Sequence, residues 1–70
     1  MEAERLVSMA NQIAVFFEHE EPAKAVERTA DHLRKYWDPR MRKAIIAHLK
    51  DGGAGLAPLV KSAVGLLPQT

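Results

Sequence analysis

Apolar residues recur along the chain at the three- and four-residue spacing of one helix face, and prolines and glycines separate the segments that show it. Pro22, Pro39 and Pro58 suit the first turn of a helix, where the missing N–H costs no hydrogen bond. Gly52 and Gly53 suit a helix C-terminus, because glycine readily adopts the left-handed conformation that is needed there. The pattern predicts helices over residues 3–18, 22–37, 39–50 and 58–67.

The predicted fold is all-α, a small bundle of three main helices and a shorter C-terminal helix in a single domain over residues 1–70. No stretch of useful length alternates with a period of two, so no strand is expected. Each predicted helix has an apolar stripe that we expect to face the core. The stripes are Leu6, Met9, Ala10, Ile13, Phe16 and Phe17; Val26, Ala30, Leu33 and Trp37; Met41, Ala44, Ile45 and Leu49; and Leu59, Val60, Ala63, Val64, Leu66 and Leu67.

Composition narrows the class of protein. The chain has no cysteine, so neither a disulfide nor a thiolate metal site can stabilise it. Ten basic and nine acidic residues give a net charge of +1, which does not favour nucleic acid as a partner. No apolar run approaches the roughly 20 residues that span a bilayer, and the N-terminus lacks the pattern of a secretory signal. We therefore expect a cytoplasmic protein without a membrane partner.

Residues that could act in catalysis or bind a metal do not form a recognisable motif in the sequence. The gaps between His19, His32 and His48 are 13 and 16 residues, whereas a metal-binding pair on one helix needs a spacing of three or four. Ser8 and Ser62 lack a nucleophile motif, and the glycines after residue 51 lack the Lys-Ser/Thr of a phosphate loop. We therefore expect no catalytic residue, cofactor site or metal site on this chain.

The segment YWDPRMRK, residues 36–43, combines the single Trp and Tyr with three cations at a predicted helix corner. Asp38 is expected to cap the following helix, and together with Gly52 it is predicted to have a structural role. Trp, Met and Arg are enriched at protein interfaces. We expect the corner to bind a partner, with the indole free to pack inward and Arg40 and Arg42 pointing outward; the predicted contact residues are Trp37, Pro39, Arg40, Met41 and Arg42.

The polar face of the first predicted helix carries almost no charge. The face presents Ser8, Asn11, Gln12, Val15 and His19, and it is almost uncharged between Arg5 and Glu18. Charge depletion is a property of interface cores, so Asn11, Gln12 and Val15 are further predicted contact residues. Val15 and Ile46 lie off their apolar stripes and are expected to be exposed.

Three blocks in order, MANQIAVFF, YWDPRMRKAI and GGAGLAPLVKSAV, resemble the delta subunit of NAD-dependent formate dehydrogenase. The resemblance covers roughly residues 8–67, and the Trp-Asp-Pro-Arg-Met segment is its most specific part.

The resemblance implies a noncatalytic accessory subunit of a cytoplasmic, molybdenum- or tungsten-dependent complex that oxidises formate with NAD⁺. The partner would be the catalytic alpha subunit, and the role would be assembly, cofactor retention or stability. The molybdopterin cofactor, iron–sulfur clusters and flavin would reside on other subunits, with none on this chain. Two alternatives stay open: a transient assembly chaperone of the same enzyme, and a small helical nucleic-acid-binding regulator that uses the corner cations.

Overall fold

The computed structural model describes residues 2–68, and this part of the chain is helical without strands. The all-α prediction is thereby confirmed. The prolines at 22, 39 and 58 each open a helix, as the fixed φ of proline favours. The helices are α1 (Ala3–Val15), α2 (Pro22–Tyr36), α3 (Pro39–Lys50) and α4 (Pro58–Gly65).

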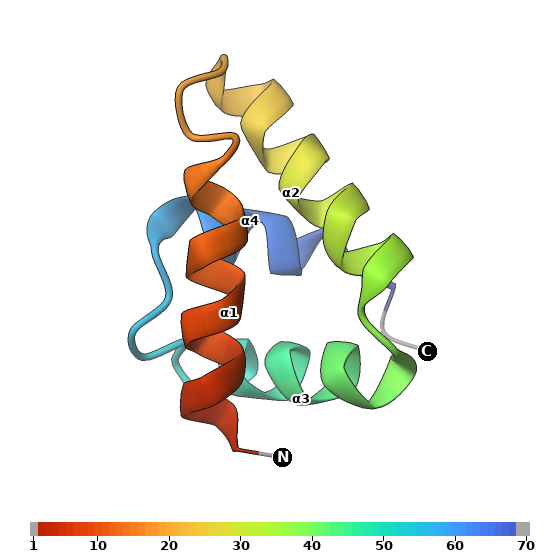
Figure 1. The fold of residues 1–70 in the computed structure, drawn as a ribbon. Coiled ribbons are helices and arrows are strands. Elements are labelled where there is room, and N and C mark those ends of the chain that lie inside the picture. The colour runs from red at the N-terminus through yellow and green to blue at the C-terminus, as the bar shows by residue number, and fades with distance from the viewer. Residues whose placement is uncertain (1, 69–70) are drawn as a thin grey trace.

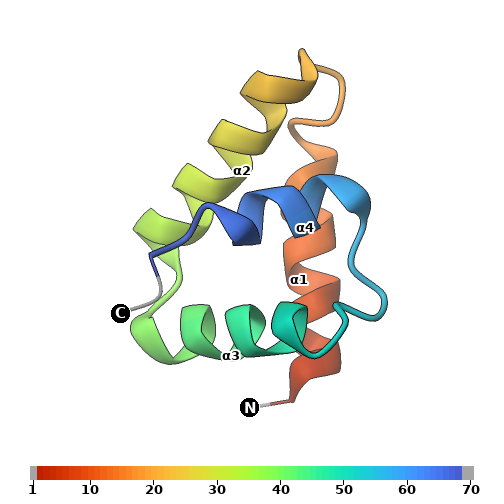
Figure 2. The ribbon, with the colours of Figure 1, turned by 180° about the vertical axis from the view of Figure 1, so that it is seen from behind.

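The four helices enclose one core. Figure 1 shows α1 and α2 diverging from the turn that joins them, with α3 running between their far ends. Seen from behind in Figure 2, α4 crosses between α1 and α2 above α3. This shortest helix contacts all three others, most extensively α2, so each longer helix packs its apolar side against it.

The core contains side chains from every helix. Leu33, Ile45 and Val60 have no exposed surface, and the Trp37 indole at the end of α2 is also buried. None of the helices in the described part of the chain has both the length and the apolar character that crossing a membrane requires.

Three helices end earlier than predicted: α2 ends one residue early, at Tyr36, and the other two end two or three residues early. Helix α1 ends at Val15 instead of residue 18, because the N–H groups of Phe16 and Phe17 bond to carbonyls three residues back. The same tightening affects Leu66 and Leu67, so α4 ends at Gly65 instead of residue 67. Hydrogen bonds to the carbonyl three residues back form a 3₁₀ turn, which is common at the end of an α-helix.

The buried face of α1 also differs from the predicted stripe. Met9 is 37% exposed and Phe16 is 73% exposed, whereas Val7 and Ala14 are buried. Ala14 and the fully buried Ala10 are small, so neighbouring helices can approach α1 closely on their side. Since α2, α3 and α4 all contact α1, their positions decide which side is covered.

Two further predictions about burial were wrong. Ile46 was expected to be exposed but is 9% exposed, because α3 packs against both α1 and α4 and its apolar surface is therefore wider than one stripe. Leu66 was expected in the core but is 59% exposed, whereas its neighbour Leu67 is 5% exposed and belongs to the core. The expected exposure of Val15 is confirmed at 58%.

Candidate docking surface

The corner between α2 and α3 is built from the Trp-Asp-Pro segment. Trp37 and Asp38 have extended backbone conformations that end α2 and redirect the chain. The Asp38 carboxylate accepts a hydrogen bond of 3.0 Å from the Met41 N–H, in the position of an N-cap. The indole packs inward, as the sequence allowed, so Trp37 contributes to the core and presents little surface to a partner.

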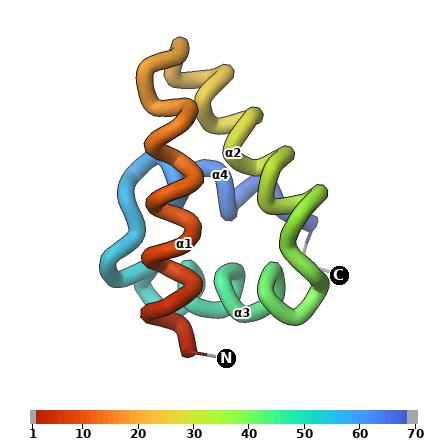
Figure 3. The backbone as a smooth tube through the Cα atoms, viewed as in Figure 1, coloured from red at the N-terminus to blue at the C-terminus, as the bar shows by residue number. Residues whose placement is uncertain are grey.

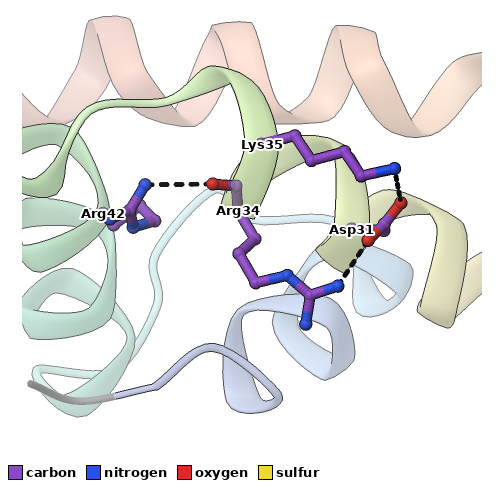
Figure 4. A network of polar contacts seen from close by, with 4 residues as sticks. All are labelled: Asp31, Arg34, Lys35 and Arg42. Atoms are coloured by element: carbon purple, nitrogen blue, oxygen red, sulfur yellow. Dashed lines mark hydrogen bonds and ion pairs between the residues drawn. The ribbon is translucent and has the colours of Figure 1, made fainter.

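Arg42 turns back toward α2 and does not point outward as expected. Its guanidinium donates a 3.1 Å hydrogen bond to the Arg34 carbonyl (Figure 4). The same group donates a second hydrogen bond to the Trp37 carbonyl. Carbonyls in the last turn of a helix have no intrahelical donor, and the negative end of the helix dipole favours a cation. Arg42 therefore joins the start of α3 to the end of α2.

The rest of the corner is divided between exposed and half-buried residues. Pro39 and Arg40 are exposed, and Met41 is half-buried against the core. Their contact with a partner stays a prediction. The structure thus leaves Arg40 as the corner arginine that faces solvent, because Arg42 is used within the fold.

The flank of α2 beside this corner carries charges that pair with one another. The Asp31 carboxylate lies 3.0 Å from the Lys35 ammonium and also binds the Arg34 guanidinium, as Figure 4 shows. Hydrogen bonds from Lys35 and then Arg34 hold the pKa of the Asp31 carboxyl below its ordinary value. Such a paired, exposed surface is typical of a helix side that faces water.

Asn11 fastens the loop between α3 and α4 to α1. Its side-chain amide donates a 3.0 Å hydrogen bond to the Gly55 carbonyl, and its carbonyl oxygen accepts a 3.1 Å bond from the Ala57 N–H. Figure 3 shows this loop running alongside α1. On the loop's other side, His48 Nε2 lies 2.8 Å from the Ala54 carbonyl oxygen. The predicted partner contact of Asn11 stays a prediction, but both ends of its amide already have partners within the chain.

Glycines allow the loop to leave α3. Gly52, at φ +111°, donates to the Leu49 carbonyl at 3.1 Å, and Gly53, at φ +65°, donates to the His48 carbonyl at 2.9 Å. This pair of bonds is the Schellman arrangement that closes a helix with left-handed residues. The structural position predicted for Gly52 is thus the first left-handed residue after α3.

The outward side of α1 forms an uncharged helix surface between Arg5 and Glu18. We call it the α1 outer face. Gln12 and Val15, two of the predicted contact residues, are exposed there. No charged residue occurs between Arg5 and Glu18. The α1 outer face comprises the exposed residues Ser8, Met9, Gln12, Val15 and Phe16.

Met9 and Phe16 are the members of this face that sequence reasoning missed, since both were assigned to the core. A usable signal was present in the sequence. Ala10 and Ala14 are four residues apart on one side of α1, and small residues at this spacing favour close approach of another helix. The side of α1 that carries these two alanines is the buried side, and Met9 and Phe16 lie away from it.

Among residues 2–68, no group of three or more His, Asp or Glu side chains is placed to hold a metal ion.

Comparison with known proteins shows the family to which the chain belongs. No curated protein and no solved structure matches the chain. Residues 5–64 match the family described as NADH-dependent formate dehydrogenase delta subunit FdsD. Because the match spans most of the 70 residues, the chain belongs to this family of formate dehydrogenase delta subunits.

Proposed function

We propose that this chain is a noncatalytic accessory subunit that docks on the catalytic, formate-oxidising subunit of a cytoplasmic NAD-dependent formate dehydrogenase. Its role is to support assembly of the complex, retention of the cofactors or stability of the active enzyme. The molybdopterin cofactor, the iron–sulfur clusters and the flavin belong to other subunits. The observation that carries this proposal is the family match over residues 5–64.

The way in which the chain uses its polar side chains supports a noncatalytic role. Asn11 and His48 hold the loop before α4, whereas Asp38 and Arg42 hold the corner between α2 and α3. Each of these groups is bonded to the backbone of the chain itself. These four side chains therefore serve the fold of the chain.

The proposal is tested by producing the other formate dehydrogenase subunits with and without this chain. Native mass spectrometry of the purified complex gives the stoichiometry, and metal analysis gives the molybdenum or tungsten content. Formate-dependent NAD⁺ reduction is measured before and after mild heating. We expect the chain in a fixed ratio to the catalytic subunit, and lower metal content or faster heat inactivation without it.

Two results would overturn this assignment. Full metal content, activity and heat resistance without the chain would remove the accessory role. A mature, active complex that lacks the chain, but forms only when the chain is produced, would make it a transient assembly chaperone.

A further inference from the structure

The α1 outer face differs in composition from the solvent sides of the other helices. The exposed side of α3 carries Arg40, Lys43 and Lys50, whereas the α1 outer face carries no charge. Its members include a methionine and a phenylalanine, which interface cores favour over charged residues. The outward side of α2 carries six charged residues, which are Lys24, Glu27, Arg28, Asp31, Arg34 and Lys35.

The spacing on this face matches a helix that lies in a groove. Met9, Gln12 and Phe16 are separated by three and four residues, so they form one row along α1. Ser8 and Val15 extend the face on the other side of Gln12. Helices that dock into apolar grooves use anchors at these spacings. Charged residues lie beyond both ends of the face, in the arrangement of a charged rim around an uncharged centre.

Phe16 is the most exposed large apolar residue among residues 2–68, and hydrogen bonds hold its backbone in place. Its N–H bonds to the Ile13 carbonyl at 3.1 Å, and the next residue, Phe17, is half-buried with its ring 6.5 Å from that of His32. An ion pair of 3.0 Å between Arg28 and Glu20 ties the same turn to α2. Phe16 is therefore presented outward by an ordered turn, and little backbone freedom is lost when it is covered.

We infer that the α1 outer face seats in an apolar, charge-poor groove on the formate-oxidising subunit, with Phe16 as its anchor. This inference rests on the proposed function and names the surface that performs it. Family membership as a delta subunit supplies a larger protein partner, and the absence of charge on the face makes a polyanion a poor match.

A second copy of this chain fits the α1 outer face less well than a groove on a larger protein does. Stable interfaces bury roughly 800 Å² on each partner. The whole chain exposes 4728 Å², and five side chains along one helix provide too little of it for a flat helix-to-helix contact of that size. A groove in a larger protein also covers the sides of the helix, so the same face buries more area there.

The test uses a matched pair of exposed aromatic residues. Phe16 on the α1 outer face is 73% exposed, and Tyr36 on α2, outside this face, is 72% exposed. Full-length chains carrying Phe16→Ala, Gln12→Glu or Tyr36→Ala are titrated onto formate dehydrogenase that was purified without this chain. Denaturant unfolding of each variant checks that the fold is kept.

We expect Phe16→Ala to weaken binding at least tenfold, as for a buried aromatic anchor. Gln12→Glu is expected to weaken binding because it places a charge in the centre of the face, and Tyr36→Ala is expected to stay within about twofold of the unaltered chain. If the unaltered chain binds and the Phe16 and Gln12 variants bind equally well, the inference about the surface is wrong and the proposed function stands.

Two other results overturn the inference in different ways. If the unaltered chain does not bind the enzyme, the proposed function fails and the inference fails with it. If the isolated chain is a dimer and Phe16→Ala makes it monomeric without changing its affinity for the enzyme, the face belongs to a second copy.

Discussion

The guanidinium of Arg42 donates a hydrogen bond to the backbone carbonyl of Trp37, so a side chain of α3 closes the C-terminal end of α2. A second bond from the same group reaches the Arg34 carbonyl at 3.1 Å. Two contacts therefore hold Trp37 in place: its indole is buried in the core, and its backbone carbonyl accepts the bond from Arg42.

Replacing Arg42 with alanine is expected to lower the free energy of unfolding by about 1–2 kcal/mol, because two carbonyls lose a charged donor. Arg40 is the matched control, since it is exposed on the same helix and its side chain makes no hydrogen bond with the described part of the chain. Arg40→Ala should change the free energy of unfolding by less than about 0.5 kcal/mol. Urea titration of both variants measures the difference, and equal losses would show that Arg42 does not join the helices.

Asn11 and Gln12 are neighbours in α1 with opposite expected effects on stability. Asn11→Ala removes both bonds to the α3–α4 loop and leaves the Ala57 N–H without its acceptor, at a cost of roughly 1–3 kcal/mol. Gln12 is exposed, so Gln12→Ala should stay within about 0.5 kcal/mol of the unaltered chain. Hydrogen exchange at the Ala57 amide is a direct readout. Unchanged protection of this amide in Asn11→Ala would contradict the role of Asn11 in holding the loop.

The features that the sequence predicted correctly depend on neighbouring residues. The starts of α2, α3 and α4 follow from proline, whose fixed φ acts within one turn. The cap at Asp38 likewise involves a residue only three positions away. Local chemistry of this kind can be recognised without knowledge of the fold.

Two features that the sequence did not predict depend on distant residues, and a third depends on how two successive helices meet. Asn11 and Gly55 are 44 positions apart, and a pattern in α1 gives no indication that a loop will supply a carbonyl there. The outward direction of Met9 follows from where α2, α3 and α4 pack. Arg42 was assigned to a docking surface because its charge suggested exposure, but uncapped carbonyls at the end of α2 were within its reach.

Gly53 and Gly65 provide a contrast between a required and a replaceable glycine. Gly53 has φ +65°, and a Cβ there would lie 3.1 Å from Leu49 Cδ1 and 3.3 Å from Lys61 Cε. Gly53→Ala is expected to cost about 1–2 kcal/mol from the left-handed conformation, with a further cost from crowding. A Cβ on Gly65 would meet nothing within 4 Å, so Gly65→Ala should stabilise the chain by roughly 0.4–1 kcal/mol.

Thermal unfolding of both glycine variants, followed by circular dichroism, checks these opposite signs. A rise in the melting temperature of Gly53→Ala would contradict the requirement for a left-handed residue after α3. A fall for Gly65→Ala would show that the end of α4 needs the backbone freedom of glycine.

The Asp31 carboxylate is expected to make stability depend on pH. Its pKa is lowered in the folded chain by hydrogen bonds from Lys35 and Arg34, so the unfolded chain takes up a proton first as the pH falls. The contribution of Asp31 is therefore complete above its unfolded pKa of roughly 4 and is lost as the pH falls through the lower folded value. Asp31→Asn should destabilise the chain at pH 7, and its difference from the unaltered chain should shrink below about pH 4.

The cations provide the control for this prediction. In a chain carrying both Arg34→Ala and Lys35→Ala, the additional change Asp31→Asn should have little effect at any pH, because the groups that lower the Asp31 pKa are gone. Urea titrations from pH 2.5 to 7 in low salt measure all four chains, and added salt should reduce the effect because the pairs are exposed to solvent. If Asp31→Asn lowers stability equally across this pH range, its ion pairs do not produce the effect, and the loss must come from the amide itself.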